Sequence, residues 1–251
     1  MEPDKQLDAI RERIDAIDSR LLELISERAR CAQEVAEVKL AASQSSDAPP
    51  TFYRPEREAQ VLRAIQERNP GPLASDYVAS IFREIMSSCL ALEKPLSVAY
   101  LGPEGTYSQA AALKHFGQSV IPVGQSSIHK VFRQVESREC DYGVVPVENS
   151  TEGMVGQTLD SFLETPLQIT GEIELPVVHH LLGAANTQVD SVKLVLGHEQ
   201  ALAQCRQWLD SHLPDVPRET VASNGAAALR AAGETGVAAI AGDLAAPLHQ
   251  L

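Results

Sequence analysis

The sequence is short of basic residues and of long apolar runs, and each shortage excludes a class of protein. Lysine and arginine together number 21 against 34 acidic residues, and the net charge of −13 argues against nucleic acid or an anionic membrane as a partner. No apolar stretch approaches the ~18 residues that a membrane-spanning helix needs. The charged N-terminus has no signal-peptide core, so we expect a cytoplasmic protein.

The chain also lacks the usual motifs for metals, disulfides and dinucleotides. Its four cysteines lie far apart and form no Cys-x-x-Cys pair, which indicates neither a zinc site nor a disulfide framework. The turn GPEGTYS does not match the dinucleotide pattern G-x-G-x-x-G. His198-Glu199 lacks the second histidine of a zinc-protease helix, and His179-His180 fits a strand better than a metal pair. We therefore expect no metal and no cofactor.

What remains is the composition of a globular protein with room for two cores. The chain has 251 residues, of which 44% are hydrophobic and 22% are charged. The pattern changes after Lys94-Pro95 from helical periodicity to alternating strands and helices. This change predicts an all-helical domain over residues 1–95 and an α/β domain over residues 96–251.

The first domain is predicted to depend on one long helix from Leu7 to Leu40. Apolar residues recur there at helical spacing, and neither Gly nor Pro interrupts them. Such a helix is too long for the core of a compact monomer, so its apolar stripe needs a partner. After a loop over Ala41–Pro50, shorter helices follow from about Pro55 to Arg68 and over residues 73–94. Helices of such unequal length predict an interlocked dimer.

Cations interrupt the apolar stripe of the long helix. Arg28 stands where the heptad steps 14, 21, 28 and 35 call for an apolar residue. Lys39 lies eleven residues later, about 20° away around the helix, and Arg11 is a third cation on the same helix. These side chains could simply extend to solvent at the edge of a coiled coil. Alternatively, buried cations without nearby carboxylates imply an anionic ligand inside a helical bundle.

The shorter helices add further polar candidates. Arg54 and Glu58 lie one helical turn apart with Arg57 between them, and Cys89 and Glu93 share one face of the third helix. An exposed ion pair between Arg54 and Glu58 would contribute only a few tenths of a kcal/mol and needs no functional explanation. Both interpretations stay open at this point.

The second domain is predicted to form α/β layers with mainly parallel sheet. Strand-like segments fall into groups separated near Glu174 to Gly183, which predicts two lobes with a cleft between them. A β-rich run is expected over Pro166–Leu175 and one continuous helix over Glu199–Leu213.

Two predicted strand ends carry polar groups, and open α/β sheets bind ligands beyond the carboxyl ends of their strands. In VAYLGPEGTYSQAA, Thr106 and Ser108 lie at a helix N-terminus, where free N–H groups and the helix dipole favour an anion. In YGVVPVENSTEG, Glu148 and Asn149 follow a buried strand, with Ser150-Thr151 next to them. Each segment could also be an ordinary capped turn.

Several motifs together resemble known enzyme families. LDAIRERIDAIDSRLLELISERARCAQEVAEVK, FYRPERE and IFREIMSSCLALE are similar to the all-helical chorismate mutases. VAYLGPEGTYSQAAA, CDYGVVPVENSTEG and GHEQALAQC are similar to prephenate dehydratases. In this order the two halves resemble the bifunctional P-proteins of phenylalanine biosynthesis. The expected architecture is therefore a three-helix mutase domain, as an interlocked dimer, followed by a two-lobed α/β domain like periplasmic binding proteins.

The mutase resemblance implies a homodimer that rearranges chorismate to prephenate without a cofactor. This pericyclic reaction needs a compact substrate conformer and stabilisation of the charge that develops on the breaking ether oxygen. The resemblance assigns the substrate carboxylates to Arg28 and to Arg11 from the partner subunit, and the ether oxygen to Lys39. It assigns the substrate hydroxyl to Glu58. The remaining residues expected to line this pocket are Arg54, Arg57, Cys89 and Glu93.

Cys89 and Glu93 depart from the family pattern, in which a serine and a glutamine are often found. A carboxyl group can donate a hydrogen bond to the ether oxygen only when it is protonated. We therefore expect mutase activity to fall as the pH rises, and Glu93→Gln to flatten that profile.

The dehydratase resemblance implies that prephenate binds between two lobes and loses its ring hydroxyl together with carbon dioxide, giving phenylpyruvate. It assigns this site to Glu148, Asn149 and Gln204, with Cys205 beside them and the turn at Thr106 and Ser108 in the same cleft. The family's Thr-Arg-Phe motif is absent from this sequence. We therefore expect a chain truncated at its C-terminus, with an incomplete dehydratase and no phenylalanine-sensing ACT domain.

Two other functions remain as alternatives. One is a non-catalytic dimeric module that binds a small carboxylate, and the other is a mutase-only enzyme with a structural α/β appendage. The trio Arg28, Lys39 and Glu58 favours an enzyme, because a plain coiled coil has no reason to place these residues on its inner face.

Overall fold

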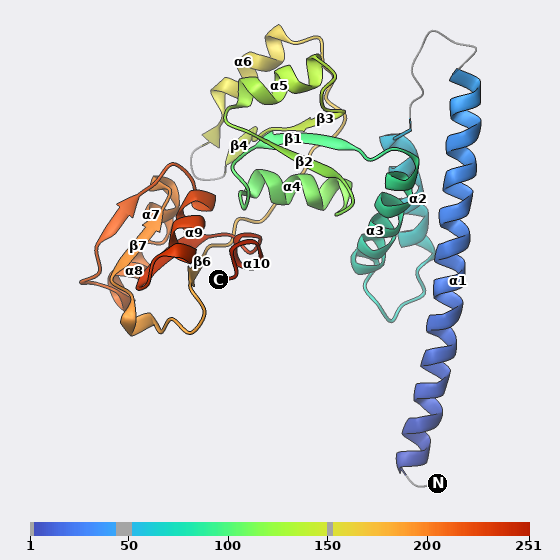
Figure 1. Ribbon diagram of the computed structural model, residues 1–251, viewed down its shortest axis with the longest axis horizontal. Coiled ribbons are helices and arrows are strands. Elements are labelled where there is room, and N and C mark those ends of the chain that lie inside the picture. Colours follow the sequence, from blue (N-terminus) through green and yellow to red (C-terminus); the bar gives the residue numbers. More distant parts are fainter. Residues whose placement is uncertain (1–2, 44–51, 150–152) are drawn as a thin grey trace. The chain divides into compact units, whose positions relative to one another are not determined.

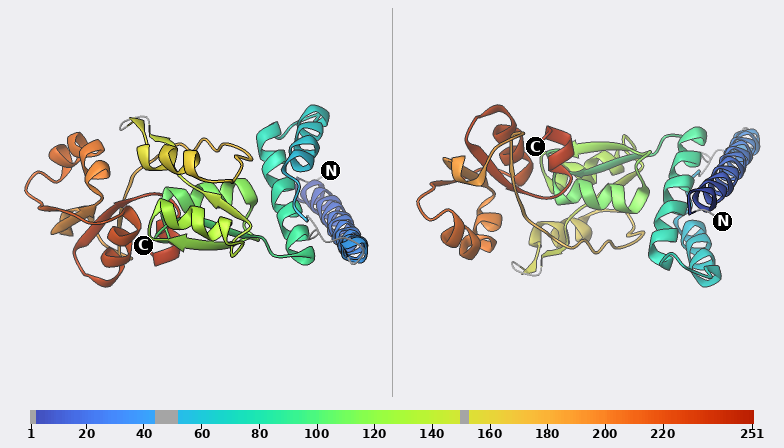
Figure 2. Two further views of the ribbon diagram at one scale, coloured as in Figure 1. Left: turned by 90° about the horizontal axis from the view of Figure 1, so that it is seen from above. Right: turned by 90° about the horizontal axis from the view of Figure 1, so that it is seen from below.

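A computed structural model describes residues 3–43, 52–149 and 153–251 of the chain (Figures 1 and 2). It divides into two compact units. The first comprises Met1–Leu96 with Phe116–Val120, and the second comprises Ser97–His115 with Ile121–Leu251. Most of the predicted loop after the long helix, and the predicted Ser150 and Thr151, lie outside the described residues.

In the first unit the predicted helices are present, and the longest extends further than expected. Helix α1 covers Pro3–Ser43, α2 covers Pro55–Arg68 and α3 covers Ser75–Glu93. Pro55 occupies the first position of α2, where its missing N–H costs no helical hydrogen bond. After α2, the Asn69 side chain donates to the carbonyl of Leu73 at 2.8 Å, which closes the turn into α3. The N-terminal part of α1 extends past both shorter helices (Figure 1).

The apolar stripe of α1 remains largely exposed in the single chain. Burial in this unit is concentrated at Ala36, Leu62, Ala79 and Cys89, around the C-terminal part of α1. The exposed stripe residues have relative accessibilities of 41% to 57%. They are Leu7, Ile10, Ile14, Ile17, Leu21, Leu24, Ile25, Val35 and Leu40. Over the described residues, no helix is both long enough and apolar enough to cross a membrane.

The second unit begins with a parallel sheet of order β2–β1–β3. Strand β1 is Ser97–Leu101, β2 is Ile121–Gln125 and β3 is Tyr142–Val144. The central strand is buried, as expected for a parallel sheet covered on both faces. Figure 1 shows α4 (Tyr107–Phe116) on one face and α5 (Ile128–Glu136) on the other, which follows from right-handed crossovers in opposite directions.

After β3 the chain departs from the prediction. A short antiparallel pair, β4 (Glu148–Asn149) with β5 (Gly153–Met154), leads into α6 (Gly156–Glu164), a helix that the sequence analysis missed. The β-rich run predicted over Pro166–Leu175 is wrong, because this described segment forms no strand. Prolines stand at both of its ends and cannot donate to a strand ladder, and most of its residues are exposed.

A further sheet has the order β6–β9–β7–β8. Strand β6 (His180–Gly183) runs antiparallel to β9 (Val237–Ala241), whereas β7 (Leu194–Gly197) is parallel to both β9 and β8 (Arg218–Thr220). The helix expected over Glu199–Leu213 is interrupted at Cys205, which has φ −88° and ψ 2°. The helical segments here are η1 (Val189–Ser191), α7 (Glu199–Gln204), α8 (Arg206–His212), α9 (Asn224–Gly233) and α10 (Ala245–His249).

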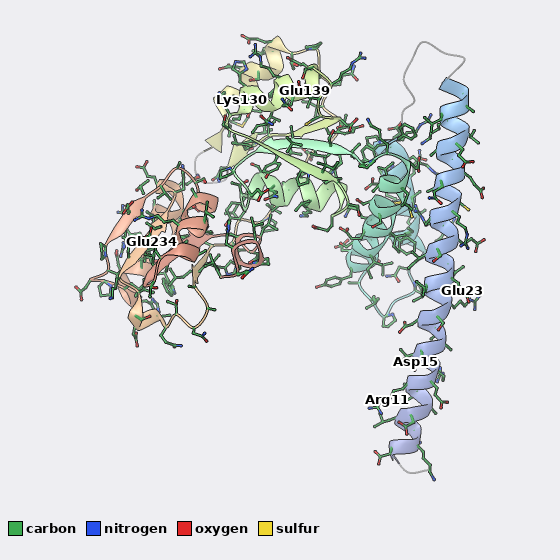
Figure 3. All side chains as sticks on the ribbon, viewed as in Figure 1. Arg11, Asp15, Glu23, Lys130, Glu139 and Glu234 are labelled. Atoms are coloured by element: carbon green, nitrogen blue, oxygen red, sulfur yellow. The ribbon has the colours of Figure 1, made fainter. Side chains whose placement is uncertain are left out.

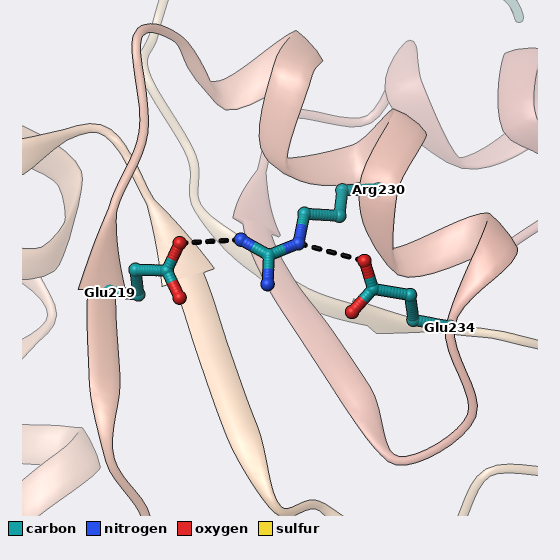
Figure 4. A network of polar contacts seen from close by, with 3 residues as sticks. All are labelled: Glu219, Arg230 and Glu234. Carbon is teal, nitrogen blue, oxygen red and sulfur yellow. Dashed lines mark hydrogen bonds and ion pairs between the residues drawn. The ribbon is translucent and has the colours of Figure 1, made fainter.

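This sheet has a core of small side chains and an ion-pair network at its surface. Ala227, Ala228 and Ala231 of α9 are fully buried and pack in one cluster with Ala239 and Ala241 of β9. At the surface, Arg230 of α9 pairs with Glu219 at 2.5 Å and with Glu234 at 2.8 Å (Figure 4). Exposed pairs of this kind contribute little to stability, so the core determines this packing.

Candidate active sites

In the helical unit, Lys39 and Glu93, which were both predicted to line the mutase pocket, lie together. The premise of buried cations without nearby carboxylates is therefore wrong at Lys39, because a carboxylate lies beside it. The Lys39 ammonium lies 3.3 Å from Glu93 Oε2, and it donates to the carbonyl of Phe52 at 3.0 Å. The two side chains are 24% and 10% exposed, so both are largely removed from water. Cys89 is buried on α3, one helical turn before Glu93. The ammonium is thus fixed by α3 and by the segment before α2, at a place where it can donate to a ligand oxygen.

Glu58 lies in a second polar group of the same unit. Its carboxylate is 3.6 Å from Nε of Arg83 on α3, which makes an ion pair longer than a hydrogen bond, and it is hydrogen-bonded by Tyr53. Burial raises the pKa of Glu58, although the hydrogen bond from Tyr53 and the positive charge of Arg83 act to lower it. The sequence analysis missed both partners, yet Tyr53 lies in the motif FYRPERE and Arg83 in IFREIMSSCLALE.

The predicted arginines have less defined places in the single chain. Arg28 is partly buried on α1, whereas Arg54 and Arg57 are exposed. The carbonyl of Arg54 accepts the N–H groups of Arg57 and Glu58 and so closes the first turn of α2. Arg11 lies on the exposed N-terminal part of α1, where its side chain is 72% exposed and pairs with Asp8 at 3.1 Å (Figure 3).

In the second unit, a pocket of about 80 Å³ lies at the N-terminus of α4. Thr106 and Tyr107 line it together with Leu175, Val178 and the loop after β9. The Thr106 hydroxyl lies 3.1 Å from the carbonyl of Leu101 and 3.0 Å from that of Pro103, so it closes the turn. Lining residues are Gly105, Thr106, Tyr107, Ala110, Leu175, Pro176, Val178, Gly242, Asp243 and Leu244. Ser108 is partly buried in the first turn of α4 and is not among them.

A hydrogen-bond chain links this pocket to Gln204. The Tyr107 hydroxyl lies 3.0 Å from Nδ1 of His179, and Nε2 of His179 lies 2.6 Å from Oε1 of Gln204. The amide oxygen of Gln204 can only accept, so Nε2 of His179 donates to it. The Tyr107 hydroxyl has one proton, and it donates this proton to the carbonyl of Val178 at 2.7 Å. Burial raises the pKa of Tyr107 to about 12, with smaller contributions from Asp243 and Cys205. The phenol therefore keeps its proton at neutral pH.

The sequence patterns did not predict the roles of Tyr107 and His179 in this hydrogen-bond chain. His179 and His180 were expected only in a strand; β6 begins at His180, which pairs with Asp243 of the pocket. Gly242 lies so close to Tyr107 that an added Cβ would lie 2.8 Å from its ring. The only sequence signal was that Tyr107 belongs to the motif GPEGTYS.

The other predicted dehydratase residues lie elsewhere. Glu148 is exposed and Asn149 is partly buried on β4, and neither lines the pocket. Cys205 lies at the break between α7 and α8, and burial raises the pKa of its thiol. Among the described residues, no three His, Cys, Asp or Glu side chains gather into a set that could hold a metal ion.

Comparison with known proteins decides the family. The chain matches the family model for chorismate mutase type II over residues 10–94 and that for prephenate dehydratase over residues 98–251. It is 59% identical over 246 residues to the bifunctional chorismate mutase/prephenate dehydratase of Pseudomonas aeruginosa, which covers 98% of this chain and 67% of that protein. The chain belongs to the bifunctional chorismate mutase/prephenate dehydratase family. The predicted resemblance is confirmed.

Other relatives agree with this membership. The family protein of Aquifex aeolicus is 41% identical over 251 residues, again covering 98% of this chain and 67% of that protein. Among solved structures, a prephenate dehydratase from Arthrobacter aurescens in complex with L-Phe has a TM-score of 0.57 and 30% identity. That match covers 61% of this chain and 52% of the other. The predicted order of a helical mutase domain and an α/β dehydratase domain is thus confirmed.

Proposed function

We propose that the helical unit rearranges chorismate to prephenate. The observation that carries this proposal is the pairing of Lys39 with Glu93, which together with the carbonyl of Phe52 holds an ammonium group in a largely buried position. The reaction breaks a C–O bond and forms a C–C bond in one step, so it requires positioned donors and no nucleophile. In this site Lys39 would donate to the ether oxygen and Glu58 would accept the substrate hydroxyl.

The proposed site needs a second copy of the chain. An interlocked homodimer would cover the exposed apolar stripe of α1 and would carry Arg11 of one subunit to the site of the other. Arg11 and the partly buried Arg28 would then bind the two substrate carboxylates, as bidentate guanidinium groups do well. Arg54, Arg57 and Cys89 would complete the wall of the pocket. Residues 1–95 form this domain in the proposal.

We further propose that residues 96–251 contribute two lobes, arranged as in periplasmic binding proteins, to the conversion of prephenate to phenylpyruvate. The hydrogen-bond chain from Tyr107 through His179 supports a place for Gln204 beside the substrate. Glu148, Asn149, Thr106 and Ser108 remain predicted members of that cleft. A cytoplasmic location also remains a prediction, and it agrees with the free thiols of the four cysteines.

A time course tests these proposals. Purified protein is mixed with chorismate, and prephenate and phenylpyruvate are quantified separately. Formation of prephenate faster than in buffer supports the mutase, and its further conversion to phenylpyruvate supports the dehydratase. Prephenate that accumulates unchanged would favour the mutase-only alternative. Loss of chorismate no faster than in buffer would overturn the proposal in favour of a carboxylate-binding module.

A further inference from the structure

We propose that Phe116–Val120, the last residue of α4 and the turn that leads to β2, is a positioning element of the mutase site. This turn belongs by sequence to the dehydratase half, but it is part of the helical unit. In the proposal it acts on Glu58 through Phe116 and Tyr53. The inference rests on the proposed function, in which Glu58 accepts the substrate hydroxyl.

Polar contacts attach the turn to helix α3. The backbone N–H of Gln118 donates to Oε2 of Glu84 at 3.0 Å. One turn further along α3, the hydroxyl of Ser88 lies 3.0 Å from the hydroxyl of Ser119. Contacts from successive turns of one helix fix both the position and the direction of the segment.

Gly117 allows the close approach between this turn and α3. Its φ of +83° lies in the left-handed region, which favours glycine. A Cβ added at Gly117 would lie 2.4 Å from Cβ of Ser87, so any larger residue would push the turn away from the helix. The sequence thus contains a glycine where both backbone conformation and space require one.

The aromatic contact leads from the turn to the candidate site. The rings of Phe116 and Tyr53 pack at a centroid distance of 5.8 Å and an interplanar angle of 60°, and both side chains are buried. Tyr53 precedes α2, so its backbone is not part of the helix and its side chain depends on neighbouring residues for its position. Its hydroxyl makes the hydrogen bond to Glu58. Phe116 therefore packs against the residue that orients the carboxylate.

The groups that contact Glu58 make its pKa sensitive to the position of Tyr53. Tyr53, from the segment before α2, and Arg83, from α3, both favour the ionised carboxylate. If Tyr53 is displaced, one of these interactions is lost and the pKa of Glu58 rises further. The acid limb of the mutase pH profile then moves to higher pH, because the ionised carboxylate is the stronger acceptor for the substrate hydroxyl.

The experiment uses the full chain and the variants Phe116→Ala, Tyr53→Phe and the double variant. The kcat/KM for chorismate is measured across the pH range. In each single variant kcat/KM is expected to fall about tenfold, and the acid limb of the profile is expected to move to higher pH. The double variant should have a kcat/KM only slightly below that of Tyr53→Phe, because the effects of residues in contact are not additive. A variant with only a structural defect would have lower mutase activity but an acid limb at the wild-type pH.

Controls separate the possible outcomes. Phe132 is a matched residue, since it is similarly buried and packs against Phe162 at 5.3 Å in the α/β unit; Phe132→Leu should leave mutase activity unchanged. If circular dichroism shows that Phe116→Ala does not fold, Phe116→Leu replaces it and must show the same limb shift. If a folded Phe116 variant keeps wild-type kcat/KM and an unmoved acid limb while Glu58→Ala is inactive, the inference about Phe116 is overturned and the role of Glu58 stands. An active Glu58→Ala would instead contradict the role proposed for Glu58, because alanine has no side-chain acceptor.

Discussion

The helical unit and the α/β unit solve the problem of burial in different ways. In the α/β unit the central strands are fully buried, as at Ala99 and Ala239, and a hydrogen-bond chain runs from Tyr107 in the pocket through His179 to Gln204. The helical unit instead exposes the apolar stripe of α1 and organises its candidate site with ion pairs, at Lys39 and at Glu58. Under the proposed function the helical site needs a second subunit, whereas the described pocket of the α/β unit is lined by residues of one chain.

The largest expected effect tests the charged site. Lys39→Ala should lower the mutase kcat about 10²–10³-fold, as removal of a positioned transition-state donor typically does. The measurement is prephenate formation at saturating chorismate. Lys193→Ala, a change of the same kind on an exposed residue of the α/β unit, serves as the control and should change nothing. A kcat for Lys39→Ala within about threefold of the wild type would contradict the proposed role of the ammonium group.

Subunit mixing tests whether the helical site is shared between chains. Arg11→Ala and Arg28→Ala should each be nearly inactive alone. In a mixed dimer, one site combines the intact Arg28 of one chain with the intact Arg11 of the other. Statistical mixing should therefore restore about a quarter of wild-type mutase activity, because half the dimers are mixed and each has one intact site.

The outcome of mixing is decisive for the comparison. Activity that stays at the sum of the separate variants, while size-exclusion chromatography shows exchanged dimers, would mean that each site is built within one chain. The exposed stripe of α1 would then need another explanation than an interlocked dimer.

A smaller effect is expected in the α/β unit. His179→Ala removes the link between Tyr107 and Gln204, and prephenate conversion to phenylpyruvate should fall about tenfold, as for the loss of one hydrogen bond. Mutase activity in the same variant should be unchanged. His212→Ala is the control, because that histidine stacks on Trp208 at the surface, away from the pocket. If His179→Ala and His212→Ala lose the same dehydratase activity, the hydrogen-bond chain through His179 has no specific role in the reaction.

Local sequence patterns predicted the helical unit well. The apolar period of α1 and the proline at the start of α2 depend on neighbouring residues only, and both helices lie where expected. The run Pro166–Leu175 failed because alternation predicts a strand only when a partner strand is available. The break at Cys205 divides a helix that periodicity alone had made continuous.

The candidate sites also differ in how far local sequence patterns predict them. Lys39 and Glu93 were named from the family resemblance, and they meet in the structure. Tyr107 and His179 lie 72 residues apart, and neither has a pattern of its own that indicates the other. Contacts of this kind depend on how the strands and loops pack, which local periodicity does not describe. The role of Glu93 in the pH profile stays a prediction.

The smallest expected effect concerns stability and follows from the burial of Glu58. Because its pKa is raised above the ordinary value of 4.5, the folded state binds this proton more tightly than the unfolded state does. The free energy of unfolding should therefore fall as the pH rises from the unfolded pKa to the raised folded one, and then level off. Glu58→Gln should lack this component, and Tyr53→Phe should extend it to higher pH.

Urea unfolding between about pH 4 and pH 7 measures this component. Helical circular dichroism reports on both units, whereas the fluorescence of Trp208, the only tryptophan, reports on the α/β unit alone. The Glu58→Gln difference should appear in the first signal and not in the second. A Glu58→Gln difference in the Trp208 transition would show that the two units do not unfold separately.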